Sequence, residues 1–135
     1  MMKDKNLLAA ACIAGFLAVA LGAFGAHGLK PYLNEYQIMI FEKGVNYQFY
    51  HALAAILACV LFEFKKQQML LMAATLFIFG IVFFSGSLYL LATADMTGFP
   101  KNVAGPMTPA GGLAFLAGWA VLVISTLKNS SISNN

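Results

Sequence analysis

Four long apolar stretches, separated by short polar segments, make up most of this 135-residue sequence. They cover about residues 7–26, 44–64, 69–93 and 110–127. A helix needs about 20 predominantly apolar residues to cross the hydrocarbon core of a bilayer. Charged residues make up only 10% of the chain, against about 25% in soluble proteins. The sequence therefore predicts an all-α integral membrane protein. Residues 1–128 would form one domain, a four-transmembrane-helix bundle, and residues 129–135 a disordered tail.

The second stretch is the least uniform of the four. Its mainly apolar part, residues 52–64, has about 13 residues and contains Glu63, so it is too short to cross a bilayer. A spanning helix must therefore begin near Gly44 and carry the polar segment that follows into the membrane. That segment contains Asn46, Tyr47, Gln48, Tyr50 and His51.

The other stretches carry their polar residues toward the same side of the membrane. In a four-span topology this side, the outer half, holds the end of the first stretch, the second half of the third and the start of the fourth. The residues concerned are His27, Ser85, Ser87, Tyr89 and Thr108. Because unpaired polar groups are costly in hydrocarbon, these side chains are expected to face the helix bundle or water. With the polar residues of segment 46–51 they form a candidate binding cluster, predicted as a polar pocket open to the outside.

Two interpretations of this cluster stay open. Interhelical hydrogen bonds that only fix packing are favoured for the serines and for Asn46. For His51 a packing role and a functional role are both considered, because an ionisable group inside a span is a functional candidate by default. His27, which stands beside glycines at a helix end, is expected to cap that end or to meet lipid headgroups.

Small residues recur at every fourth position of the first stretch: Ala10, Ala14, Ala18, Gly22 and Ala26. On a helix they form one ridge, and such ridges let membrane helices approach one another closely. The fourth stretch contains further small residues, Gly112, Ala114 and Gly118. We expect both sets to support helix packing and the ridge to support self-association into a homo-oligomer.

The connecting segments also carry signals. Residues 32–43 predict an amphipathic interfacial helix that runs into the second span. Residues 94–107 predict a loop, after which Thr108 and Pro109 resemble the N-cap and first residue of a helix. The first stretch follows a basic N-terminus, as in a signal peptide, but it exceeds the usual apolar length of such peptides. A retained span is therefore favoured over cleavage.

Lysine counts predict the orientation. The side of the termini carries Lys3, Lys5, Lys65, Lys66 and Lys128, and the other side carries Lys30, Lys43 and Lys101. The positive-inside rule then favours a multi-pass plasma (inner) membrane protein with both termini in the cytoplasm. Inverted or dual topology stays open.

No catalytic, metal or cofactor motif stands out. Cys12 and Cys59 each lie alone in an apolar run, which is typical of packing residues. His27 and His51 differ in depth by about 10 Å at 1.5 Å per residue, which argues against a bis-histidine haem. The dispersed lysines do not indicate nucleic-acid binding. The sequence favours a non-enzymatic protein without a cofactor, whose partners are the lipid bilayer, further copies of the chain, and a lipid or small-molecule ligand.

A small transporter or channel is the alternative. No span centre carries Asp or Glu, so the membrane-embedded carboxylate on which small proton-coupled exporters depend is missing. A polar path centred on His51 stays open, because an imidazole can exchange a proton near neutral pH.

Four motifs, in order along the chain, resemble a known family of small membrane proteins. They are GAFGAHGL at residues 22–29, YQFYHAL at 47–53, FSGSLYLL at 84–91 and TPAGGLAFLAGW at 108–119. The family is the one catalogued as domain of unknown function 423, and the resemblance covers essentially the whole chain. It implies a four-span inner-membrane protein and brings no established activity, cofactor or catalytic residue. It also directs attention to the polar segments that the span-length argument singled out.

Overall fold

The computed structural model describes residues 2–128, and every regular element in this range is helical. The predicted tail, residues 129–135, lies outside the described residues. The elements are α1 (Met2–Phe24), η1 (Gly25–Leu29), α2 (Glu35–Lys65), α3 (Gln68–Gly80), η2 (Ile81–Ser85), α4 (Gly86–Ala92), α5 (Ala94–Thr97) and α6 (Lys101–Leu127). The π-helical turn η1 continues α1, and η2 joins α3 to α4 in one long helix. Four helices are therefore long and apolar enough to span a membrane, which confirms the predicted all-α membrane fold.

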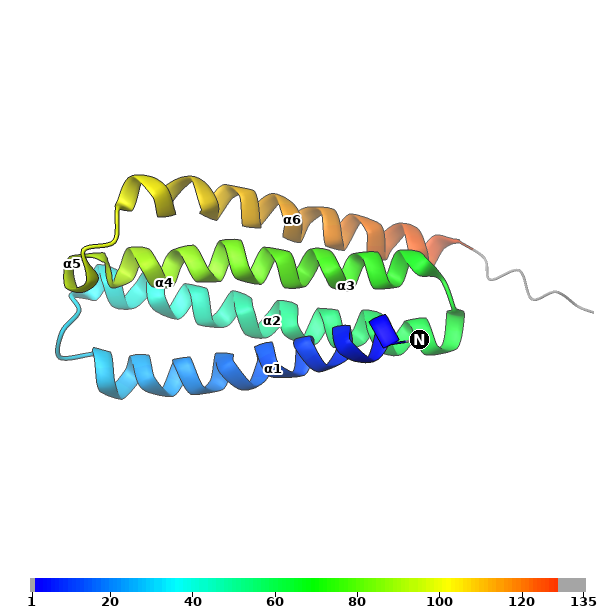
Figure 1. Cartoon of the computed structure of the whole chain (residues 1–135), viewed down its shortest axis with the longest axis horizontal. Coiled ribbons are helices and arrows are strands. Elements are labelled where there is room, and N and C mark those ends of the chain that lie inside the picture. The colour runs from blue at the N-terminus through cyan, green and yellow to red at the C-terminus, as the bar shows by residue number, and fades with distance from the viewer. Residues whose placement is uncertain (1, 129–135) are drawn as a thin grey trace, which may run out of the picture.

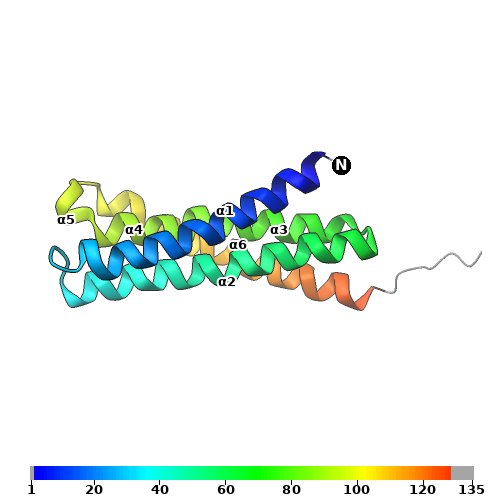
Figure 2. The ribbon, with the colours of Figure 1, turned by 90° about the horizontal axis from the view of Figure 1, so that it is seen from below.

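The four long helices lie side by side in an open row (Figure 1). Each packs against its neighbour in the order α1, α2, α3–α4, α6; α1 also contacts α3, and α1 and α6 lie at opposite edges. Seen from below, α1 is nearest the viewer and crosses in front of α3–α4 (Figure 2). The helices thus form an array with two broad faces, in place of a closed bundle in which the first helix would pack against the last.

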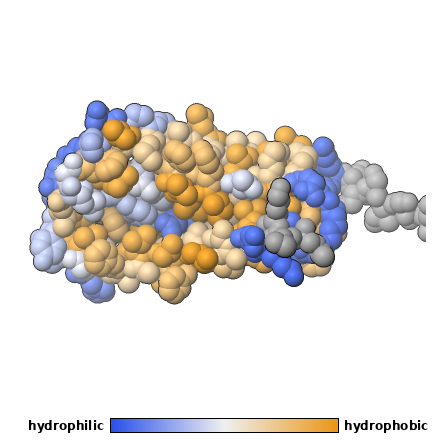
Figure 3. Space-filling view, viewed as in Figure 1, coloured by the Kyte–Doolittle hydropathy of each residue, from blue (hydrophilic) through white to orange (hydrophobic). Residues whose placement is uncertain are grey.

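The two ends of the row differ. One end, the terminal end, holds the start of α1, the α2–α3 turn and the end of α6 (Figure 1). The other end, the loop end, holds the connection from η1 to α2 and the short helix α5. An apolar belt separates two hydrophilic ends on the face shown in Figure 3, as expected of a chain that crosses a bilayer. The shared side of the termini agrees with the four-span topology, and their placement in the cytoplasm stays a prediction.

Helix α2 begins earlier than the apolar pattern indicated. A capping box starts it: the Asn34 side chain accepts from the Gln37 N–H at 2.9 Å, and the Gln37 side chain accepts from the Asn34 N–H at 2.9 Å. The predicted interfacial helix, residues 32–43, is therefore no separate element but largely the first turns of α2. Phe41 in these turns is buried with Leu29 and Leu33, so apolar contact keeps the segment along the row.

Helix α6 also begins earlier than predicted. It starts at Lys101, and α5 covers Ala94–Thr97, so the predicted loop over residues 94–107 is reduced to residues 98–100. Thr108 is not the N-cap, and its hydroxyl bonds the Ser87 hydroxyl at 2.6 Å. Pro106 and Pro109 lie inside the helix, where each removes one backbone donor. Membrane helices tolerate such prolines because neighbouring groups and local adjustments satisfy the freed carbonyls.

Glycines bring α6 against the third long helix. A Cβ atom on Gly111 would lie 2.2 Å from the backbone nitrogen of Phe84, and one on Gly118 would lie 2.7 Å from the Phe77 ring. Ala114, between them, is buried. Gly112 differs, because a Cβ there would lie 3.9 Å from its nearest neighbour. The close contact thus depends on Gly111 and Gly118, and Gly112 borders open space.

The middle of the small-residue ridge of α1, from Ala14 to Gly22, faces α2 within the same chain, whereas Ala26 is exposed. Ala18 is buried, a Cβ on Gly22 would lie 3.2 Å from the Val45 side chain, and the Ala14 carbonyl accepts a hydrogen bond from α2. The middle of the ridge that predicted self-association is therefore used for packing inside the chain.

Gly111→Ala is expected to lower the free energy of unfolding by about 1–3 kcal/mol, the usual cost of overpacking a close contact. The new Cβ meets backbone, which cannot move aside as a flexible side chain can. Gly105→Ala on the same helix is the matched control, since a Cβ there meets nothing within 4 Å. Reversible unfolding in detergent measures both variants. If the Gly111→Ala and Gly105→Ala variants were equally stable, the close contact between α6 and η2 would be contradicted.

Candidate functional site

Hydrogen bonds between side chains and backbone tie the helices together from the loop end to the centre of the row. The Ser85 hydroxyl donates to the Gly44 carbonyl at 2.6 Å. The Tyr89 hydroxyl donates to Gln48 Oε1 at 2.7 Å. Gln48 Nε2 donates in turn to the Ala14 carbonyl at 2.8 Å. Within the described residues, no buried side-chain nitrogen or oxygen lacks a partner. For these residues the geometry supports the packing interpretation.

The absence of a side chain at Gly44 makes this network possible. A Cβ there would lie 2.8 Å from the Tyr89 ring and 3.3 Å from the Ser85 carbonyl oxygen. The backbone of α2 therefore approaches η2 and α4 closely enough for the Ser85 hydroxyl to reach it.

His51 lies near the middle of α2 and is buried. Its Nδ1 is 2.7 Å from the Tyr47 carbonyl oxygen, and its Nε2 is 3.1 Å from Trp119 Nε1. A carbonyl can only accept and an indole N–H can only donate. Nδ1 must therefore carry the proton and Nε2 must accept, which defines the neutral Nδ1–H tautomer. The imidazole also stacks on the Phe115 ring, with centroids 3.5 Å apart and an interplanar angle of 11°.

This arrangement restricts what His51 can do chemically. Both ring nitrogens are used, and a second proton on Nε2 would face the Trp119 N–H. In this conformation His51 offers no free nitrogen to a substrate or to a moving proton. Its position is fixed by one bond within α2 and by two aromatic side chains of α6.

A groove of about 740 Å³ opens beside His51, on the face of the row where α2 and α6 flank η2. We call it the α2/α6 groove. Its lining is mainly aromatic and aliphatic: Tyr47, Tyr50, His51, Phe84, Pro109, Gly112, Leu113, Phe115, Leu116 and Trp119. Because these helices form the apolar belt, the groove opens toward lipid. It combines an apolar wall with one polar contact, the bond between buried His51 and exposed Trp119, and a mainly apolar lining with a few polar groups is common in ligand sites.

A smaller pocket of about 280 Å³ continues the groove toward the loop end. It shares Tyr47 and Tyr50 with the groove and adds Met39, Glu42, Lys43 and Asn46. Asn46, Tyr47 and Tyr50 are exposed here, next to charged residues of α2. This extension, which we call the groove mouth, therefore lies at the level where side chains meet lipid headgroups.

The remaining predicted residues lie apart from the groove. His27 is exposed on η1 at the loop end. Ser85 and Tyr89 belong to the internal network. Ser87 and Thr108 join α4 to α6 through their hydroxyls. The predicted cluster is thus split into an internal packing network and a surface groove, which share α2.

Sequence reasoning missed the contribution of α6 to the site. Trp119, Phe115 and Gly112 follow one another at helical spacing on one face, and Trp119 is the only tryptophan of the chain. That pattern was readable, but an aromatic stripe on a membrane helix is equally typical of lipid contact. Only the fold places Trp119 against His51.

A polar link at the loop end was also missed. Asp95 accepts from Gln37 Nε2 at 2.8 Å and pairs with Lys101 Nζ at 2.8 Å. The hydrogen bond and positive charge of Lys101 lower the pKa of the Asp95 carboxyl below its usual range. The link is therefore complete above the ordinary carboxyl pKa and weakens as the pH falls through the lowered pKa. Both side chains are largely exposed, so the contribution to stability is small.

No group of three or more His, Cys, Asp or Glu side chains within residues 2–128 is arranged to hold a metal ion. The fold and the groove together define a small polytopic α-helical membrane protein, with an internal polar network and an aromatic surface groove. The model of the family described as protein of unknown function, DUF423, matches residues 21–112. The chain belongs to this family.

Relatives support the assignment over nearly the whole chain. A UPF0382 membrane protein of Staphylococcus haemolyticus is 43% identical over 94% of this chain and 98% of its own length. A UPF0382 membrane protein of Haemophilus influenzae is 37% identical over 97% of this chain and 100% of its own. The UPF0382 inner membrane protein YgdD of Escherichia coli is 34% identical over 94% of this chain and 93% of its own length. No solved structure matches the chain significantly.

The tautomer of His51 can be tested directly. Nitrogen NMR of protein carrying labelled histidine should show, for His51, one protonated and one unprotonated ring nitrogen, with the proton on Nδ1. His51→Gln assigns the signals, since the chain has only two histidines. A His51 signal with the proton on Nε2, or on both nitrogens at neutral pH, would contradict the bonds to Tyr47 and Trp119.

The bond between Gln48 and Tyr89 should couple the two residues energetically. In a double-mutant cycle of Gln48→Leu and Tyr89→Phe, we expect a coupling of about 0.6 kcal/mol, the average for side-chain hydrogen bonds in a membrane protein. Unfolding in detergent measures it. The control cycle replaces Tyr89→Phe by Tyr50→Phe, because the Tyr50 side chain is exposed on the surface. Equal coupling in both cycles would refute the bond.

Proposed function

We propose that this protein is a non-enzymatic membrane protein that binds the apolar part of a lipid or small amphipathic molecule in the α2/α6 groove. The observation that carries the proposal is the groove itself, an aromatic-lined hollow of about 740 Å³ between two membrane helices. Its volume lies within the range of about 300–1,000 Å³ that is usual for small-molecule sites.

The polar groups beside the groove suit an apolar ligand. His51 and Trp119 satisfy each other at the wall, so an apolar chain or ring placed there leaves no buried polar group unpaired. The rings of Phe84, Phe115 and Trp119 offer large contact surfaces.

The mouth of the groove suits the polar end of the same ligand. Tyr47 and Tyr50 present hydroxyl groups at the junction, and Asn46 and Lys43 lie beyond them. An amphipathic molecule would place its head at these side chains and its apolar part against α6. This arrangement follows the usual order of the bilayer, with polar groups toward the loop end.

The other functions considered have less support. A proton path through His51 needs a free ring nitrogen, and both are hydrogen-bonded. Self-association was expected from the small-residue ridge of α1, and the middle of that ridge packs against α2.

Trp119 fluorescence tests the proposal, because its signal arises from a single site in the groove. In vesicles of ordinary phospholipid, quenching of Trp119 by an added brominated fatty acid should saturate at a low mole fraction if the groove prefers this amphipathic molecule to the surrounding phospholipid chains. Gly112→Leu should abolish this early saturation by filling the groove, since a Cβ on Gly112 has room.

Gly86→Leu is the matched control, because a Cβ on that helical glycine meets nothing within 4 Å and Gly86 does not line the groove. The Trp119 fluorescence of this variant should be quenched to the same extent as in the unmodified protein. If quenching rises in proportion to the content of brominated fatty acid, and Gly112→Leu follows the same curve, the groove holds no preferred ligand and the proposal fails.

A further inference from the structure

A second hollow lies on the opposite side of α2, between α1 and α3 at the terminal end. Its volume is about 580 Å³, and its lining is Asn6, Leu7, Ala10, Gln68, Leu71, Met72 and Thr75. We call it the α1/α3 cleft. It shares no lining residue with the α2/α6 groove. The first turns of α1 tilt away from the row, as Figure 2 shows, and this tilt leaves α3 uncovered there.

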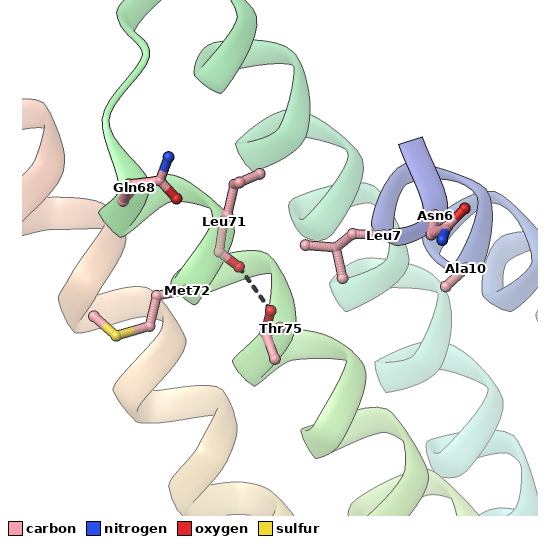
Figure 4. A pocket seen from close by; sticks show the side chains of 7 residues that line it. All are labelled: Asn6, Leu7, Ala10, Gln68, Leu71, Met72 and Thr75. Atoms are coloured by element: carbon pink, nitrogen blue, oxygen red, sulfur yellow. Dashed lines mark hydrogen bonds between the residues drawn. The ribbon is translucent and has the colours of Figure 1, made fainter. Parts of the chain in front are cut away.

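Polar and apolar groups are separated along the cleft. Asn6 and Gln68 provide amide groups at its terminal-end rim, and Leu7 and Leu71 flank the space behind them (Figure 4). The Thr75 hydroxyl donates to the Leu71 carbonyl at 2.8 Å, so it adds no unpaired donor to the interior. From Gln68 to Thr75 the wall extends about 10 Å along α3 at 1.5 Å per residue. The cleft thus offers hydrogen bonds at the surface and an apolar slot below it.

The net positive charge of the protein is concentrated at this end. The terminal-end segments contain five lysines against Asp4 and Glu63, whereas the loop-end segments contain three lysines and three acidic residues. The whole formal charge of +3 therefore belongs to the terminal end. Lys65 and Lys66 lie at the α2–α3 turn, shortly before Gln68 at the rim, and Lys66 Nζ pairs with Glu63 at 2.6 Å. A positive surface next to a bilayer attracts anionic lipids.

We propose that the α1/α3 cleft binds one anionic phospholipid. Its phosphate and headgroup meet the amides of Asn6 and Gln68 within the positive field of the terminal end, and the upper part of one acyl chain lies between Leu7 and Leu71. Charge complementarity favours an anionic over a zwitterionic lipid, and the depth of the slot favours a lipid over a free anion. This site is independent of the ligand proposed for the α2/α6 groove.

Native mass spectrometry of the full chain in neutral detergent tests this inference. The probes are dioleoyl phosphatidylglycerol and dioleoyl phosphatidylcholine, which share acyl chains and differ in headgroup charge. We expect one phosphatidylglycerol molecule to bind at least ten-fold more tightly than phosphatidylcholine. Free glycerol phosphate should not displace it at equal concentration. Equal affinity for the two lipids, or displacement by glycerol phosphate, would overturn the proposal.

Two sets of variants separate the slot from the charge. Ala10→Phe should fill the slot and weaken phosphatidylglycerol binding at least five-fold. Ala9→Phe, on the neighbouring exposed position of α1, should leave it unchanged. If Ala10→Phe does not fold, Asn6→Leu combined with Gln68→Leu tests the rim instead. If Ala10→Phe, or the Asn6→Leu and Gln68→Leu double variant, bound phosphatidylglycerol as tightly as the Ala9→Phe control, the site would be refuted.

Lys65→Gln combined with Lys66→Asn tests the charge; Asn suits the left-handed conformation of residue 66, whose φ is 52°. We expect a loss of about five-fold per lysine for phosphatidylglycerol and no loss for phosphatidylcholine. Lys30→Gln with Lys43→Gln, at the loop end, is the control. Gly112→Leu should leave phosphatidylglycerol binding intact, which distinguishes failure at this cleft from failure at the α2/α6 groove. An equal loss from both lysine pairs would overturn the role of the terminal end.

Discussion

The Gln48 side chain holds three of the long helices in one register. It donates to the backbone of α1 at Ala14 and accepts from Tyr89 of α4. A buried amide in hydrocarbon is costly unless both ends are paired, so the sliding or rotation of any of these helices is opposed. The bonds form only because Gly22 and Gly44 let the backbones approach. Polar pairing and small residues therefore depend on each other.

The His51 site depends on the same arrangement. His51 lies about one helical turn beyond Gln48 on α2, and its imidazole rests on Phe115. Phe115 in turn occupies the space left by Gly80, where a Cβ would lie 2.3 Å from the ring. The imidazole of His51, a functional candidate in the sequence, is thus held in one position in the wall of the groove. At the groove it forms part of a mainly apolar wall.

Much of the fold could be predicted because it follows from lengths. Four apolar stretches gave four helices, and the shortness of the second one placed residues 46–51 inside a helix. The sequence could not reveal which of these residues face inward, since Asn46 is exposed and Gln48 is buried only two positions later. The starts of two helices were predicted too late. A capping box starts α2 before its apolar pattern begins, and Pro109, taken as the first residue of the fourth helix, lies inside α6. The pairing of His51 with Trp119 joins positions far apart in the chain, and no local pattern records it.

An open row has consequences for cooperativity. In a closed bundle each helix is held evenly from two sides. Here α1 is held chiefly by α2, with a smaller contact to α3, and α6 is held chiefly by the third long helix, with the His51 contacts to α2 in addition. We expect local opening to begin at these edges, with α2 and α3 as the slowest-exchanging part of the chain. Both hollows border an edge helix. Occupancy of either one would therefore be linked to how often its edge helix separates from the row.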